Sequence, residues 1–287
     1  MKLFQELKKR IGNYYKNQSR NLKKKERITA VVYVTLRVLT IFCAIAMFFM
    51  GNYNNAVLSI FTLFLFTIPD IAKKQLGIRF PTVLETSVYC FIFAAEVLGE
   101  INDFYIMIPG WDTVLHTING FLCAAIGFCL VDLLNRNSKH VNLSPLFVAI
   151  TACCFSMTVG VCWEFIEYTG DSLFAVDMQK DYMVHEIKSI LINPDGKNEP
   201  VIIQGIEGMT LHLDDGTEYE IEGGYLDIGI NDTMKDLWVN FVGALVFSTV
   251  GYVYIKHRDK NSFAANFIPI VERSEDEDDI IKEPQET

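Results

Sequence analysis

The sequence lacks the short motifs that mark the common soluble enzymes. It contains no P-loop, no dinucleotide-binding Gly-x-Gly-x-x-Gly, no His-Glu-x-x-His and no Gly-x-Ser-x-Gly. Each of these motifs places a phosphate, a zinc ion or a nucleophilic serine in a defined geometry. Their absence leaves the familiar soluble chemistries without support.

Cysteine pairs are also lacking in the exposed segments. The seven cysteines include no Cys-x-x-Cys, and all of them fall in apolar segments. They are Cys43, Cys90, Cys123, Cys129, Cys153, Cys154 and Cys162. Cysteines in such surroundings behave as small core residues. We therefore expect neither a disulfide framework nor a thiolate metal site.

Long apolar segments are what the sequence has in abundance. Of its 287 residues, 51% are hydrophobic. A helix needs about 20 mostly apolar residues to cross the roughly 30 Å of hydrocarbon in a bilayer. The segments that approach or exceed this length are 30–50, 55–72, 82–99, 111–134, 145–168 and 234–255. Most are apolar nearly all round, unlike the amphipathic helices of soluble proteins. The sequence predicts an all-α helical membrane bundle of six transmembrane helices.

Lys and Arg are absent from two of the short loops between these segments. The first loop, 51–55, and the third, 100–110, have none, whereas the second and fourth loops and the segment before residue 30 are basic. Basic loops stay on the cytoplasmic side. We expect a multi-pass protein of the bacterial plasma membrane with both termini in the cytoplasm. Its partner is the lipid bilayer, and no nucleic acid is implied, because basic runs beside a span attract anionic headgroups.

The predicted spans divide the chain into five parts. These are a basic cytoplasmic segment (1–29), helices one to five (30–170), an extracytoplasmic acidic insert (171–231), helix six (232–255) and a cytoplasmic tail without stable structure (256–287). The insert is expected to be β-rich, because an Asp-Asp-Gly turn separates two alternating runs. The tail is charge-rich and nearly free of aromatic residues, which is typical of disorder.

Polar residues recur at helical spacing near the outer ends of three predicted helices. One set is Asp112, His116 and Asn119, a second is Glu164, Glu167 and Asp171, and a third is Asp232, Asp236 and Asn240. Because successive spans run in opposite directions, all three sets fall at one depth. An ionisable group in hydrocarbon costs at least about 2.5 kcal/mol, so matching depths indicate a shared site. An interhelical hydrogen-bond network is the alternative.

These residue types suit acid–base or metal-assisted chemistry on a lipid-linked or amphiphilic substrate. The candidate catalytic residues are His116, Glu164, Glu167 and Asp236, supported by Asp112 and Asn240. The candidate metal ligands are His116, Glu164 and Asp236, a set that suits Mn²⁺, Mg²⁺ or Zn²⁺ without choosing among them. A cation- or proton-coupled transporter, a lipid-handling protein and a non-catalytic envelope scaffold stay open as alternatives, so the sequence does not establish an enzyme.

A second polar group is expected on the cytoplasmic side. Arg37 lies about two turns into its helix, and Asp70 and Glu85 lie near the ends of two other helices. A buried cation needs a compensating anion. We expect a structural ion pair of Arg37 with one of these carboxylates.

The outer motifs resemble those of the YjdF family of bacterial multi-pass membrane proteins and, more distantly, of the VanZ-like proteins associated with glycopeptide resistance. The likeness to YjdF rests on PGWD, the His-x-x-x-Gly of His116, WEFIEY, and DTMKD followed by Gly-Ala. The VanZ-like pattern is Asp-Lys-x-x-His, Glu-x-x-Gln and Asp-x-x-x-Asn-x-x-Gly, matched at Asp112, His116, Glu164, Asp236, Asn240 and Gly243. Thr113 and Glu167 depart from that pattern. The resemblance covers residues 80–250 and implies a membrane fold and this site, but no reaction.

Overall fold

The structure is a computed structural model, and it describes residues 2–76, 80–137, 142–174, 176–257 and 266–267. Side chains are described for these residues except 2–23, 25, 76, 136 and 137. Most of the predicted tail, 256–287, lies outside the described residues. So do most side chains of the basic segment 1–29.

Within the described residues, six helices are long and apolar enough to cross a membrane, which confirms the predicted fold class. They are Glu26–Phe49, Tyr53–Gln75, Thr82–Ile101, Trp111–Asn135, Pro145–Phe174 and Ile230–His257. Large aliphatic and aromatic side chains are exposed along them, including Phe42 at 69% and Trp238 at 63%. In water such a surface would be costly, whereas hydrocarbon accepts it.

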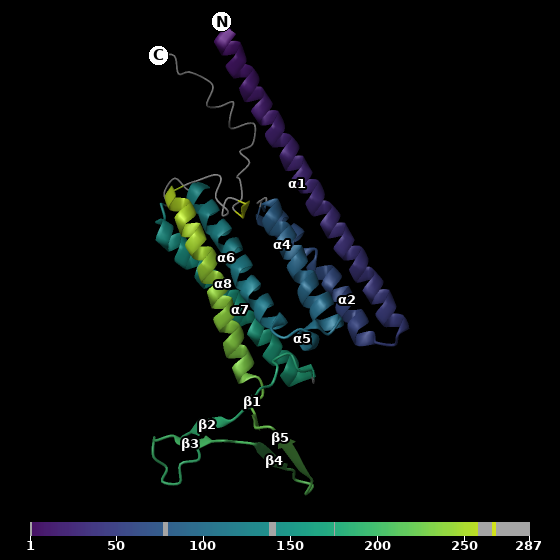
Figure 1. Cartoon of the computed structure of the whole chain (residues 1–287), viewed down its shortest axis with the longest axis vertical. Coiled ribbons are helices and arrows are strands. Elements are labelled where there is room, and N and C mark those ends of the chain that lie inside the picture. The colour runs from purple at the N-terminus through teal and green to yellow at the C-terminus, as the bar shows by residue number, and fades with distance from the viewer. Residues whose placement is uncertain (1, 77–79, 138–141, 175, 258–265, 268–287) are drawn as a thin grey trace. The chain divides into compact units, whose positions relative to one another are not determined.

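Two of the six spans are built from more than one helical element. Figure 1 labels most of the helices. The helices are α1 (Lys2–Phe49), α2 (Tyr53–Leu65), α3 (Ile68–Leu76), α4 (Thr82–Ile92), the π-helix η1 (Phe93–Ile101), α5 (Phe104–Met107), α6 (Trp111–Asn137), α7 (Pro145–Phe174) and α8 (Ile230–His257). The break between α2 and α3 precedes Pro69, whose ring clashes with a preceding carbonyl and which has no N–H to donate. The third span continues from α4 into η1, and π-helical turns are frequent near functional sites.

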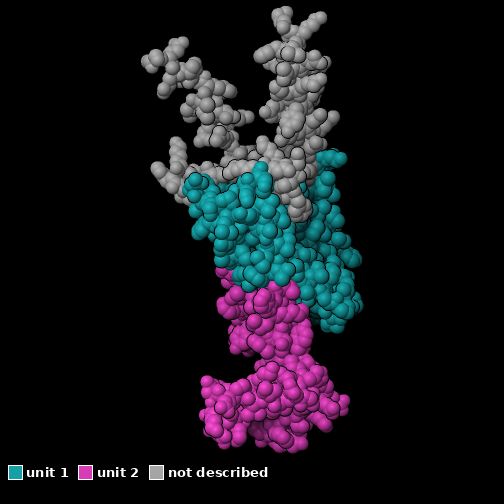
Figure 2. Space-filling model, turned by 60° about the vertical axis from the view of Figure 1, so that its left-hand side comes forward, with its two compact units in different colours: residues 1–157, 240–287 teal, residues 158–239 magenta. Residues whose placement is uncertain are grey.

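The chain forms two compact units (Figure 2). The first comprises residues 1–157 and 240–287, and the second comprises residues 158–239. The core of the first unit consists of Leu84, Leu122, Ala124, Ala125, Phe128, Cys129, Val148, Ala152, Ala244, Phe247 and Phe267. Phe247 of α8 meets Phe121 and Phe128 of α6 edge to face, at centroid distances of 5.0 and 5.9 Å. Such T-shaped pairs stabilise beyond the area they bury.

Two glycines bring α6 and α8 into backbone contact within the first unit. A Cβ on Gly120 would lie 2.0 Å from the Asn240 carbonyl oxygen, and a Cβ on Gly243 would lie 2.0 Å from the Thr117 carbonyl oxygen. Small residues at these positions let two membrane helices approach closely. The contact sets the register between the two helices that carry most of the candidate site.

The second unit contains the predicted β-rich insertion. Its strands are β1 (Met183–Val184), β2 (Glu186–Ser189), β3 (Val201–Gln204), β4 (Gly208–His212), β5 (Glu218–Glu222) and β6 (Tyr225–Leu226). They pair antiparallel as β1–β6, β2–β3 and β4–β5, three sheets of two strands each. The Asp-Asp-Gly segment forms the β4–β5 turn, where Gly216 has φ +84° and Leu213 N donates to Thr217 O at 2.9 Å. Glycine adopts this left-handed conformation without strain.

The prediction that Arg37 forms an ion pair with Asp70 or Glu85 was wrong. Arg37 Nη1 donates to the Tyr33 hydroxyl one turn earlier, and the guanidinium carbon lies 5.2 Å from the Tyr33 ring centroid. Lys73 pairs with these two carboxylates instead. Its Nζ lies 3.1 Å from Asp70 Oδ1 and also forms an ion pair with Glu85. Lys73 lies three residues after Asp70 on α3, which explains the first contact, whereas the second depends on the packing of α3 beside Glu85 of α4.

Candidate functional site

The first turns of α6 place an acid and an imidazole side by side. His116 Nε2 lies 3.3 Å from Asp112 Oδ1, a pair at i, i+4. The start of α6 is anchored by Trp111, whose Nε1 donates to Ala94 O of η1 at 3.3 Å. His116 is only 8% exposed, and Asp112, one turn earlier on the same helix, is placed to orient the imidazole.

A layer of amides lies one turn deeper in the first unit. Asn119 Nδ2 donates to Asn240 Oδ1 at 3.1 Å, which joins α6 to α8. Asn240 Nδ2 also contacts Met157 Sδ at 3.6 Å, and Ser156 Oγ donates to Gly120 O at 2.8 Å, so α7 takes part. Asn240 is 1% exposed. A buried amide needs hydrogen-bond partners within the protein, and Asn240 has them.

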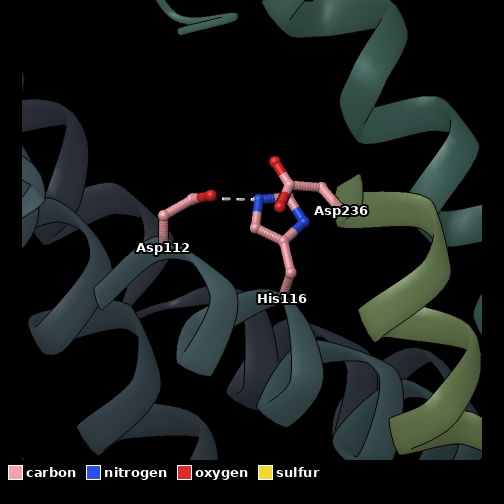
Figure 3. A group of neighbouring side chains, drawn as sticks. All are labelled: Asp112, His116 and Asp236. Carbon is pink, nitrogen blue, oxygen red and sulfur yellow. Dashed lines mark ion pairs between the residues drawn. The ribbon is translucent and has the colours of Figure 1, made fainter. Parts of the chain in front are cut away.

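Asp236 precedes Asn240 by one turn of the continuous helix α8. One carboxylate oxygen of Asp236, one of Asp112 and one ring nitrogen of His116 lie within 4.8 Å of one another. Figure 3 shows the Asp112 carboxylate facing the ring nitrogen to which it is paired, with the Asp236 carboxylate beside the same ring. Asp236 is 1% exposed. The structure thus groups three of the residues that the sequence singled out.

The donor set fits a small divalent cation. Ligands at about 2.1 Å from a tetrahedral ion lie about 3.4 Å apart, so a group within 4.8 Å needs to close by roughly 1.4 Å at most. One imidazole with two carboxylates is a common set for Zn²⁺ or Mn²⁺ and leaves a coordination position open. A dication would also offset the charge of two carboxylates in a poorly solvated place.

Glu164 and Glu167 of α7 are buried, at 4% and 7% exposed. Glu167 accepts a hydrogen bond from Trp163 Nε1 at 2.7 Å, one turn away on its own helix. Among the described residues, the group within 4.8 Å contains neither glutamate. The predicted role of both, as catalytic residues or ligands, stays a prediction.

Two of the predicted outer acids instead hold backbone of the second unit. Asp171 accepts from Met178 N and Gln179 N at 2.6 and 2.8 Å. Asp232 accepts from Lys180 N at 2.9 Å. These bonds fasten the segment that follows α7 to the helix ends. Carboxylates that accept backbone N–H groups are structural anchors, and charge assistance strengthens the bonds.

Asp227 is a third anchor that the sequence analysis missed. Its carboxylate accepts from Tyr182 N at 2.8 Å and from Asn231 N at 2.9 Å, just ahead of α8. Burial opposes ionisation of Asp227, but the hydrogen bonds from Tyr182 and Asn231 outweigh it and hold the pKa below its usual range. An Asp four residues before Asn231, at the start of a helix, was the available signal.

Lys235 is the other residue that was missed. Its Nζ lies 3.5 Å from Asp232 Oδ1 and 3.9 Å from Asp236 Oδ1, and it donates to the Tyr182 hydroxyl at 2.9 Å. It therefore supplies positive charge beside Asp236. The spacing of three residues after Asp232 could have indicated this pair.

Comparison with known proteins identifies a family. No curated protein and no solved structure matched the chain. One family model matched residues 29–257, which include the candidate site, the β-rich insertion and nearly all of the six spans. The chain therefore belongs to the family described as predicted membrane protein, DUF2238.

Proposed function

We propose that this protein is a bacterial cell-envelope membrane protein whose His/carboxylate group performs acid–base or metal-assisted chemistry on a lipid-linked or amphiphilic substrate. The observation that carries the proposal is the group itself: a buried imidazole with two carboxylates, from α6 and α8, whose ligand atoms lie within 4.8 Å of one another. Ionisable side chains are rare within membrane spans, and those that occur usually mark a functional site.

His116 is the group best suited to move a proton. Imidazole titrates nearer to neutrality than any other unperturbed side chain. Asp112 binds Nε2 at 3.3 Å and so orients the ring. Asp236 supplies a second carboxylate from the facing helix, and Lys235 lies 3.9 Å from it. This arrangement gives a fixed proton donor or acceptor with flanking charges.

The same residues would hold a divalent cation, with Glu164 as a further candidate from α7. A bound ion would polarise a phosphoryl or carbonyl oxygen, or lower the pKa of a bound water. In that case the ion would be bound and positioned by His116, Asp112 and Asp236. The hydrogen bond between Asn119 and Asn240 would hold the two helices in register.

We place this site on the outer side of the plasma membrane, with both termini in the cytoplasm. The distribution of Lys and Arg among the short loops supports this orientation. The resemblance to the YjdF and VanZ-like families supports a role in the cell envelope. The same proposal includes the five parts predicted from the sequence, whose boundaries follow residues 29, 170, 231 and 255.

Metal binding by the purified full chain tests the proposal. The protein is stripped with chelator, titrated with Mn²⁺, Mg²⁺ and Zn²⁺, and bound metal is measured by mass spectrometry. His116→Ala and Asp236→Asn should each weaken binding at least about tenfold, since losing even a group that hydrogen-bonds to a metal ligand typically costs about 10- to 100-fold. Glu164→Gln asks whether α7 supplies a ligand, and Asp195→Asn, an exposed acid of the insertion, is the control.

Folding is followed in parallel by thermal unfolding in detergent. Folded His116→Ala and Asp236→Asn proteins that bind metal as the Asp195→Asn protein does would refute the metal site. If no ion binds the wild type, the proposal of acid–base chemistry without a metal is tested by a cell-envelope phenotype in living cells. Loss of that phenotype in folded His116→Ala supports it, whereas an unchanged phenotype refutes it. Unfolding of every site variant would favour a structural hydrogen-bond network.

A further inference from the structure

A cavity of about 390 Å³ lies among α1, α3 and α4 in the first unit. It is lined by Glu26, Thr29, Ala30, Tyr33, Asp70, Lys73, Phe80, Thr82, Glu85 and Tyr89. Its volume falls within the usual range of small-ligand sites, about 300–1,000 Å³. These residues lie where the first and third spans begin and the second ends, so they mark the membrane face opposite to the start of α6. The cavity is therefore separate from the His/carboxylate group.

The charge of the lining is negative. Lys73 is shared between Asp70, at 3.1 Å, and Glu85, and Glu85 Oε1 also accepts from the Tyr89 hydroxyl at 2.9 Å. Lys73 is the only cation in the lining, against three carboxylates. Within the described part of the chain, Glu26 forms no ion pair. A cationic ligand would restore the balance, whereas an anion would add to the excess.

Aromatic rings form the walls beside these carboxylates. The Tyr33 and Tyr89 rings lie 4.8 Å apart between centroids, and Phe80 adds an apolar surface. The Tyr33 ring already attracts one cation, since the Arg37 guanidinium carbon lies 5.2 Å from its centroid. Aromatic faces together with carboxylates are the surroundings that recognise organic ammonium groups. A bare metal ion would gain little from the rings.

We propose that this cavity binds an organic ammonium group, through Glu26 and the Tyr33–Tyr89 wall. The ammonium can come from a free amine or from the headgroup of an amine-bearing lipid, because both carry the same charge and the cavity lies at a span boundary. Glu26 attracts the charge at the rim, and the tyrosine rings accept its alkyl surface. The proposal does not depend on the function of the outer site.

The test measures ligand protection of the full-length protein against thermal unfolding, at constant ionic strength. Ethanolamine and tetramethylammonium chloride are compared with potassium chloride and with inorganic phosphate in detergent. Bilayer nanodiscs of phosphatidylethanolamine are compared with nanodiscs of phosphatidylglycerol. A ligand that binds only the folded state raises the unfolding temperature with its concentration. Protection by soluble amines identifies a free amine, and protection by phosphatidylethanolamine alone identifies a headgroup.

Two variants locate the effect. Glu26→Gln should weaken amine binding by up to roughly fivefold, the size expected of an exposed ion pair, and Tyr33→Leu should weaken it further. Glu186→Gln, the same change on the insertion, is the control and should leave binding unchanged. Equal protection by potassium, preference for phosphate or phosphatidylglycerol, or a wild-type titration without protection would each overturn the proposal. The proposal would also be overturned if the Glu26→Gln protein bound amines as tightly as the Glu186→Gln protein.

Discussion

Gly243 of α8 lies so close to Thr117 of α6 that a Cβ on the glycine would be 2.0 Å from the threonine carbonyl oxygen. The obstacle is backbone, which cannot rotate away as a side chain can. Gly120 meets the Asn240 carbonyl oxygen from the other direction at the same distance. The two glycines therefore determine how near Asp236 and His116 can come, because each lies within two turns of its glycine on the same helix.

Gly243→Ala should separate α6 from α8. Overpacking typically costs about 1–3 kcal/mol, so we expect a lower unfolding temperature together with weaker metal binding at the site. Val246→Ala, on the exposed side of α8, is the control and should change neither quantity much. A Gly243→Ala protein as stable as this control would contradict the close helix contact.

The Asn119–Asn240 hydrogen bond predicts a measurable coupling energy. Either single alanine variant leaves a buried amide without its partner, at a cost of about 1–3 kcal/mol. The double variant removes both groups, so its loss of unfolding free energy should be smaller than the sum of the single losses by about 0.5–1.5 kcal/mol. Denaturation of all four proteins in one detergent gives this difference. Additive losses would show that the two amides do not interact.

Two aspartates of the second unit should respond to pH in opposite ways. Burial and then the charges of Asp177 and Asp227 raise the pKa of Asp181, so its ionised form opposes folding at neutral pH. Asp181→Asn should raise the unfolding temperature at pH 7, and the gain should vanish as pH falls through the raised pKa towards about 4, the ordinary value.

Asp227→Asn should do the reverse, because the pKa of Asp227 is lowered. The stability that this carboxylate contributes is fully present above about pH 4 and is lost as pH falls through its folded-state pKa. The variant should therefore unfold at a lower temperature than the wild type at pH 7, with the difference shrinking in stronger acid. A destabilisation by Asp227→Asn that did not change with pH would assign the effect to packing rather than to charge.

The sequence could predict the features that depend on local pattern. Segment length was enough for the six helices, and the Asp-Asp-Gly turn for the β4–β5 hairpin. Helical spacing placed Asp112 beside His116. Spacing could not say that Lys73, rather than Arg37, would reach Asp70 and Glu85, because that depends on how three helices pack.

Features that depend on irregular backbone could not be predicted from the sequence. Asp171 and Asp232 were expected with the outer cluster, yet they bind N–H groups of residues 178–180, whose path no periodic pattern specifies. The π-helical continuation of the third span, Phe93–Ile101, was likewise not predicted. The grouping of Asp236 with His116 needed both helix parity and the glycine contacts, and only parity can be read from the sequence.

Phe267 provides the last prediction, since it belongs to a region for which the sequence predicts no stable structure. It is 5% exposed, stacks edge to face on Phe121 and Phe247 at 5.5 and 6.0 Å, and its carbonyl oxygen accepts from Cys129 Sγ at 2.9 Å. Phe267→Ala should cost about 3 kcal/mol, as for other buried phenylalanines, and should expose Cys129 to maleimide.

Labelling detected by mass spectrometry separates this local effect from general unfolding. Cys129 is fully buried, so the wild type should acquire no label there, whereas folded Phe267→Ala should acquire it. Phe165→Ala, which removes a ring that is 65% exposed on α7, is the control and should leave Cys129 protected. Protection of Cys129 in both variants, with equal unfolding temperatures, would show that Phe267 does not close the core. A label at Cys129 in Phe267→Ala alone would show that this single ring, beyond the last span, covers the core.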